Sequence, residues 1–210
     1  MDRDQVLAWV KAERLSFADL LDDLDEHEWG VPSLCAGWTV RDVAAHLTLS
    51  TRSTLLGTIR SAIRARGDFD RMEDTKARER AAAFEPAELI AQIRETAGSA
   101  RRAPLSGRVD PLVDALVHGQ DIARPLGRAR EMPARPAVVA IEHVMASMFY
   151  GARKRLAGTR LVATDLEWSA GTGPDEVRGK VCDLLLLATG RPAGLAGVSG
   201  PGAERIAAAL

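Results

Sequence analysis

Three polar side chains recur at helical spacing in the stretch VDPLVDALVHGQDIARPLG, residues 109–127. Asp114 and His118 stand four residues apart, and Asp121 follows three residues later. Side chains at positions i, i+4 and i+7 share one side of a helix, so these three point the same way. A carboxylate and an imidazole on neighbouring turns can bind a divalent metal, and a third ligand then has to come from another segment. The spacing therefore indicates a candidate metal site.

A solvated helix face explains the same spacing. The apolar residues of this segment form a stripe on one side, and the three polar residues lie well round toward the other side. The stripe consists of Val109, Leu112, Val113, Leu116 and Val117. A D-x-x-x-H pattern is also less specific than the H-E-x-x-H motif of metalloproteases. The spacing alone leaves both interpretations open.

His46 is the most obvious third ligand. It lies two turns into a helix predicted over residues 40–66, whose start is marked by Thr39 and Asp42 in a pattern resembling a capping box. A ligand near a capped helix end is held rigidly, but a histidine beside an apolar stripe is often only a boundary residue of the core. Cys35, just before this helix, has two interpretations as well: a thiolate favoured by a helix N-terminus, or a small apolar plug in a tight turn.

Composition excludes several classes of protein. The 210 residues can form one large domain, or one domain with an appendage, and the 28 basic and 29 acidic residues leave a net charge of −1. This balance and the 4% aromatic content argue against a nucleic-acid or membrane partner. The two cysteines, Cys35 and Cys182, form no C-x-x-C motif, and no apolar run reaches about 18 residues. We expect a soluble cytoplasmic protein.

Hydrophobic periodicity predicts a mainly α-helical chain. The segment 67–85 is highly charged and is either a long connection or a frayed helical extension. The predicted helices cover residues 2–26 and 40–66, a segment beginning at Pro86, residues 109–127, and a segment from Pro136 to Phe149. In the last of these, Met148 and Phe149 extend the strongest apolar stripe of the chain. Residues 1–157 are therefore expected to form one helical domain.

The pattern changes after Leu156. RLVATDLEWSA alternates as a strand, with Val162, Thr164, Leu166 and Trp168 expected on its buried face. A turn follows, and VRGKVCDLLLLATG then reads as an apolar helix that ends at Gly190. Since one strand cannot stand alone, a partner is expected in this tail or across a dimer. Residues 158–210 are thus predicted to be a small α+β appendage.

Two segments carry a resemblance to a known family. VPSLCAGWTVRDVAAHL resembles the signature P-S-x-C-x-G-W-[TS]-V-x-D-[VL]-x-A-H-L of the mycothiol-dependent maleylpyruvate isomerase family, which is common in actinobacteria. VHGQDIARPLG is similar to a second signature found in one actinobacterial branch of that family. The tail LVATDLEWSAGTGPDEVRGKVCDLLLLATGRPAGL is also similar to that branch, so the likeness covers most of the chain.

The resemblance implies a DinB-like, up-and-down four-helix bundle with a metal, usually zinc, at one end. The family's histidine ligand in the A-H-L motif matches His46, and its paired ligands on a later helix match Asp114 and His118. The first residue of that pair is more often Glu or His, and the shorter aspartate reaches less far. Asp121 and Gln120 are then expected to support the ligands or to face the substrate.

The resemblance also implies a chemistry. Three protein ligands leave an open position on the metal, where a thiol can bind and lose its proton at neutral pH. In the family this thiol is mycothiol, which adds to a cis double bond, permits rotation and leaves. The same site can instead transfer the thiol to a small electrophile. We expect a thiol-dependent isomerase or S-transferase; a non-catalytic metal-binding, ligand-sensing or stress protein is the alternative.

The substrate site is less defined than the metal site. Arg41, Arg52 and Arg124 lie near the ligand helices in sequence and are candidates for binding an anionic cosubstrate or substrate, although ordinary surface arginines would look the same. The chain is also expected to lack the full C-terminal domain of the characterised isomerase. A homodimer is left open as the assembly.

Overall fold

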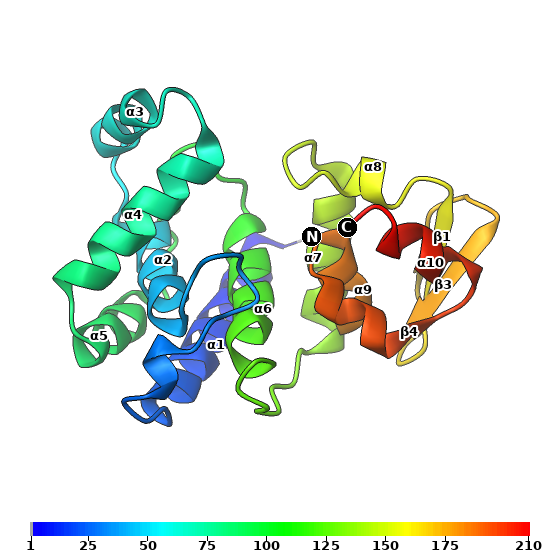
Figure 1. Ribbon diagram of the computed structural model, residues 1–210, viewed down its shortest axis with the longest axis horizontal. Coiled ribbons are helices and arrows are strands. Elements are labelled where there is room, and N and C mark those ends of the chain that lie inside the picture. Colours follow the sequence, from blue (N-terminus) through cyan, green and yellow to red (C-terminus); the bar gives the residue numbers. More distant parts are fainter. Residues whose placement is uncertain (1) are drawn as a thin grey trace. The chain divides into compact units, whose positions relative to one another are not determined.

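The computed structural model describes residues 2–210, and these form two compact units, residues 2–130 and 131–210 (Figure 1). The first unit contains α1 (Arg3–Asp22), the 3-10 helix η1 (Glu28–Gly30), α2 (Val40–Arg52), α3 (Leu55–Arg64), α4 (Phe69–Ala83), α5 (Pro86–Thr96) and α6 (Asp110–Ala123). The second unit contains α7 (Ala134–Ala146), α8 (Ala152–Arg155), β1 (Thr159–Ala163), β2 (Ser169–Ala170), β3 (Asp175–Gly179), α9 (Val181–Ala188), the 3-10 helix η2 (Pro192–Gly197), β4 (Val198–Ser199) and α10 (Pro201–Ala207).

Four helices of the first unit form the bundle that the sequence predicts. Helices α1 and α2 each contact both α5 and α6, which closes a ring around one core. The core contains fully buried side chains from all four helices, including Phe17, Val43, Leu89 and Ile122. Burying a side chain of this size stabilises the fold by about 1.5–3 kcal/mol relative to exposing it.

Helix α2 begins where its cap predicts. The Thr39 hydroxyl accepts a hydrogen bond from the Asp42 backbone N–H, and the Asp42 carboxylate accepts one from the Thr39 N–H at 2.9 Å. The helix ends at Arg52 rather than near residue 66, because Ser53 and Thr54 adopt extended backbone conformations. Thr54 then caps α3. The single helix predicted over residues 40–66 is therefore two helices.

The charged segment after α3 is also helical. Helix α4 packs along α2 and buries Met72, Ala77 and Ala81, so the alternative of a long unstructured connection is wrong. Helix α3 packs against α4 but buries none of its own residues. Its apolar side chains Leu55, Leu56, Ile59 and Ile63 are exposed. The apolar side chains in the second half of the segment 40–66, which was predicted as one helix, therefore do not belong to the core.

The boundary between the units differs from the predicted one at residue 157. Helix α7 packs against α9 of the second unit, and its buried side chains Ala140, Ile141 and Val144 belong to that core. The apolar stripe of α7 shows that one face is buried but does not say which partner buries it. Helix α7 also ends at Ala146, so Met148 and Phe149, expected to be buried, are exposed.

The tail supplies its own sheet partners. Its four strands lie in the order β2-β1-β3-β4, with β1 and β3 parallel and the outer strands antiparallel to their neighbours. The predicted buried face is wrong: Thr159, Leu161 and Ala163 point into the core, whereas Val162 is only partly buried and Thr164 is exposed. Strand β1 ends at Ala163 because the chain then turns, and Asp165 accepts a hydrogen bond from Val181 N at the start of α9. The predicted alternation continues past this turn, and it therefore places the wrong set of side chains on the buried face.

No helix within residues 2–210 combines the length and the apolar character needed to cross a membrane.

Candidate metal site

Helix α6, one of the four bundle helices, carries Asp114 and His118. His118 and Asp121 are buried, and Asp114 is only partly exposed. His118 and Asp121 contact Cys35, and the His118 ring approaches His46, so this side of α6 faces other segments of its own unit. The interpretation of these polar residues as a solvent-facing stripe is therefore excluded.

The structure brings His46 and His118 together from separate helices. Their ring centroids lie 5.2 Å apart in an edge-to-face arrangement, and the ring of Trp38 lies 5.1 Å from His46 on α2. The capping box fixes where α2 begins, so His46 is held two turns from a defined helix end. His118 is 9% exposed. Two largely enclosed imidazoles at this separation can share one ligand.

The Nδ1 atom of His118 is occupied by two neighbours. The Asp121 carboxylate lies 2.9 Å from His118 Nδ1, and Cys35 Sγ lies 3.6 Å from the same nitrogen. The Cys35 thiol donates a hydrogen bond to Asp121 Oδ2 at 3.1 Å, and the Leu34 backbone N–H donates to the Asp121 carbonyl at 3.0 Å. These contacts dock the loop before α2 onto α6. They also leave Nε2 as the nitrogen of His118 available to a metal.

The same contacts change the ionisation of His118. Burial by itself would lower the pKa of the imidazole, but the electrostatic interaction with Cys35 and the hydrogen bond to Asp121 outweigh it and raise the pKa to about 10. The contacts with Cys35 and Asp121 thus favour the protonated imidazole, and a metal ion that binds Nε2 competes with a proton.

Asp114 lies one turn before His118 in an enclosed, charged environment. Burial raises the pKa of the Asp114 carboxyl to about 6, while His118 and Arg14 oppose this rise and Asp110 and Glu73 add to it. Raised carboxyl pKa values are common at functional sites, where a carboxylate is buried in surroundings that disfavour its negative charge.

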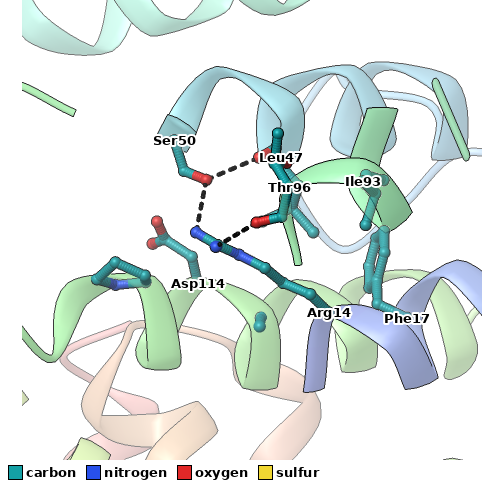
Figure 2. A pocket seen from close by; sticks show the side chains of 9 residues that line it. Arg14, Phe17, Leu47, Ser50, Ile93, Thr96 and Asp114 are labelled. Carbon is teal, nitrogen blue, oxygen red and sulfur yellow. Dashed lines mark hydrogen bonds between the residues drawn. The ribbon is translucent and has the colours of Figure 1, made fainter. Parts of the chain in front are cut away.

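Arg14 of α1 is the buried cation beside Asp114 (Figure 2). Its NH1 group donates to the carbonyl oxygens of Thr96 and Ser99 at 3.2 and 3.3 Å, and its NH2 group donates to Ser50 Oγ at 3.1 Å. The guanidinium thus holds the end of α5 while its charge faces Asp114. The cavity next to this pair encloses only about 10 Å³, which is room for about one water molecule.

Two sets of side chains are candidates for holding a divalent metal. The set predicted from the sequence, His46, Asp114 and His118, offers nitrogen and oxygen donors from two helices, and the structure brings its two imidazole rings together. The second is Cys35, Asp121 and His118 through Nδ1, whose ligand atoms all lie within 4.8 Å of one another. Ligand atoms around tetrahedral zinc lie about 3.3–3.7 Å apart. The 2.9 and 3.1 Å separations to Asp121 are ordinary hydrogen-bond lengths, so the second set better fits a support for His118.

The other predicted residues are engaged elsewhere. Gln120 donates to the Arg130 carbonyl at 2.8 Å and accepts from Arg124 Nε at 3.0 Å, so its amide ties α6 to the chain that follows. Arg41 bonds to the Phe84 carbonyl and lies 3.5 Å from Glu85. Arg52 pairs with Glu95. None of these contacts brings an arginine to the two histidines.

Sequence reasoning missed the role of two residues at this site. Glu73 of α4 lies 3.5 Å from His46 Nδ1, although its charged segment is predicted only as a long connection or a frayed helical extension. Cys35 was weighed only as a helix-terminus thiol or an apolar plug, and it contacts both Asp121 and His118. In the Cys35 case, the short distance in sequence to the A-H-L histidine was a signal that could have indicated a shared site.

Comparisons with known proteins identify the family. Residues 10–123 match the family model described as the mycothiol maleylpyruvate isomerase N-terminal domain. This match spans more than half of the chain, and the chain belongs to that family, as the two sequence signatures predict. No curated protein sequence matches the chain.

Two crystal structures share the fold along almost the whole chain. One is the mycothiol-dependent maleylpyruvate isomerase, with a TM-score of 0.66, and the other is a histidine-to-alanine mutant of that enzyme, with a TM-score of 0.65. Each is 13% identical to this chain, and each match covers 95% of this chain and 93% of the other. The expectation that a full C-terminal domain is missing is therefore wrong.

Proposed function

We propose that this protein binds a divalent metal, most simply zinc, through His46, Asp114 and His118, and uses it to activate a low-molecular-weight thiol. The observation that carries this proposal is the 5.2 Å approach of the His46 and His118 rings, with Nδ1 of His118 engaged by Asp121. Family membership supports mycothiol as the thiol. When bound, zinc with an open position lowers the pKa of a coordinated thiol and so supplies a thiolate at neutral pH.

The chain's own residues perform three tasks in this proposal. Asp121 and Cys35 orient the His118 ring through Nδ1, so that Nε2 faces the shared position. Arg14 places a fixed positive charge beside Asp114 and favours the carboxylate form that a ligand requires. Surrounding protein excludes water from α6, which strengthens each of these electrostatic interactions.

The reaction is isomerisation of, or transfer to, a small electrophile. In the isomerisation, the thiol sulfur adds to one carbon of a cis double bond, so that the carbon–carbon bond becomes a single bond and can rotate. Elimination of the same thiol then forms a trans double bond. In the transfer, the carbon–sulfur bond is retained and the neighbouring carbon takes up a proton to replace the one that the thiol lost, so that the thiol has added across the double bond. Both reactions begin with the same activated thiol, so the residues proposed to hold the metal serve either outcome.

A non-catalytic metal-binding or ligand-sensing role is the second candidate. The observation that favours it is the small cavity of about 10 Å³ beside Asp114, which has no room for an organic substrate.

Metal analysis and a thiol assay test the proposal. Untagged protein, purified without chelators, is expected to contain about one equivalent of metal, and His118→Ala is expected to lose it while keeping its helical circular dichroism. Zinc-loaded protein is then incubated with mycothiol and maleylpyruvate or other small electrophiles. Isomer or adduct formation that needs both His46 and His118 supports the enzyme. Metal binding without turnover supports the sensor, and stoichiometric metal in His118→Ala refutes the site.

A further inference from the structure

The environment of His46 includes a carboxylate that belongs to neither ligand helix. Glu73 lies in the second turn of α4, which is the most polar stretch of the bundle unit, yet its side chain is only 18% exposed. One carboxylate oxygen, Oε2, lies 3.5 Å from His46 Nδ1. The other, Oε1, accepts a hydrogen bond from Lys76 Nζ at 2.8 Å. Lys76 therefore anchors the carboxylate through Oε1, while Oε2 approaches His46 at an ion-pair distance that is longer than an ordinary hydrogen bond.

Helix α4 holds the aromatic neighbour of His46 as well. The Trp38 indole N–H donates to Asp74 Oδ1 at 2.8 Å, and Arg78 donates both to that carboxylate and to the Gly37 carbonyl at 2.7 Å. Trp38 in turn lies against one side of the His46 ring, and His118 lies 5.2 Å away. The imidazole of His46 is thus enclosed by α4 and by the loop before α2.

We propose that Glu73 is a positioning residue for His46: its carboxylate holds the proton on Nδ1 and thereby directs Nε2 toward the metal. This inference rests on the proposed function. It parallels the arrangement at His118, where Asp121 engages Nδ1. Carboxylates that bond the second nitrogen of a ligating histidine fix its tautomer and orientation, and their loss typically weakens metal binding 10–100-fold.

Direct ligation by Glu73 is the competing role, because its charge also acts on Asp114. The positions of the two oxygens favour positioning. Oε2 faces Nδ1 of His46, which is the nitrogen that a metal at Nε2 does not use, and Oε1 is paired with Lys76. A carboxylate held by an ammonium group is a weaker ligand than Asp114, which has no such pair at hydrogen-bond distance.

The test compares Glu73→Gln with Glu79→Gln in the full chain. Glu79 lies on the same helix and pairs with Arg64, but its side chain is 59% exposed, so it controls for loss of a negative charge from α4. Zinc affinity is measured by competition with a chromophoric chelator, the cobalt(II) absorption spectrum reports the ligand set, and urea unfolding of the metal-free proteins reports the fold. His118→Ala is measured in parallel.

We expect Glu73→Gln to bind zinc 10–100-fold more weakly, with an unchanged cobalt spectrum and unchanged metal-free stability, and Glu79→Gln to bind as wild type does. Zinc affinity within twofold of wild type would overturn the inference, and so would a cobalt spectrum that shows a lost ligand. If His118→Ala also binds as tightly as wild type, the proposed metal site is wrong and the inference falls with it. If His118→Ala loses zinc binding but Glu73→Gln binds as wild type does, the metal site stands and only the role of Glu73 is rejected.

Discussion

Replacing Asp114 with asparagine should stabilise the metal-free protein while removing a metal ligand. Burial raises the pKa of the Asp114 carboxyl from 3.8 to about 6, a value that already includes the attractions of His118 and Arg14. A carboxyl whose pKa is higher in the folded state favours folding when protonated, so its contribution to stability is lost as the pH rises from about 4 to about 6. Asparagine has nearly the same shape and does not ionise.

The size of the effect follows from the two pKa values. They differ by about 2 pH units, and each pH unit corresponds to about 1.4 kcal/mol, so ionised Asp114 costs the folded state about 3 kcal/mol at pH 8. At pH 4.5 the same linkage gives a cost of only about 1 kcal/mol, because this pH lies just above the pKa of the unfolded carboxyl and the folded carboxyl is still protonated. Asp114→Asn should therefore exceed wild type in stability by an amount that grows by about 2 kcal/mol between pH 4.5 and pH 8.

Urea unfolding of chelator-treated, untagged proteins measures this difference. The exposed Asp70→Asn variant controls for removing one negative charge from the bundle unit. Added zinc should then stabilise wild type and have little effect on Asp114→Asn, because ligand binding to the folded state alone stabilises it. An Asp114→Asn protein that is no more stable than wild type at pH 8, or whose advantage does not change with pH, would refute the electrostatic reasoning.

Three further substitutions test how the helices that hold the site are themselves held. Thr39→Ala should lower the free energy of unfolding by about 1 kcal/mol, because Asp42 N loses its cap; an unchanged urea midpoint would count against this helix start. Gly119→Ala should destabilise by at least about 2 kcal/mol, because its Cβ would lie 2.2 Å from Arg130 Nε and disrupt the buried pair with Glu13; a neutral result in the same assay would show that Arg130 moves freely. Arg130→Met should cost about 3–5 kcal/mol at pH 8 by leaving the Glu13 carboxylate buried and unpaired. Burial already raises the pKa of Glu13, and removing Arg130 takes away the charge that opposes this rise, so the loss should shrink as the pH falls and the buried carboxyl of the variant takes up a proton; a loss independent of pH would argue for packing instead.

Local signals predicted several features of the site correctly. The capping pair at Thr39 and Asp42 placed the start of α2, and Pro86 marked the start of α5. Helical spacing put Asp114 and His118 on one side of α6, and the two family signatures predicted the family that the comparisons identify. Each of these features depends on residues that are close to one another in the sequence. The interactions that determine them are therefore local and can be predicted without the tertiary structure.

Features that depend on which surfaces meet were predicted less well. The sequence predicts the apolar stripe of α7 but not its packing against α9. The alternation of β1 was recognised, but a turn after Ala163 changed which face is buried. The segment over residues 67–85 is predicted as a long connection or a frayed helical extension, yet it forms α4 and brings Glu73 to His46. The hydrophobic periodicity of a segment shows that one of its faces is apolar. It does not identify the helix or strand that covers this face.

The order of residues along the chain is enough to name the ligand candidates and the start of each helix that carries them, because hydrogen bonds and side-chain spacing within one helix are local. The approach of His46 to His118, the contact of Cys35 with Asp121 and the raised pKa of Asp114 arise only when separate helices exclude water from the same space. Burial and the charges of neighbouring helices set those properties, and both are consequences of tertiary packing.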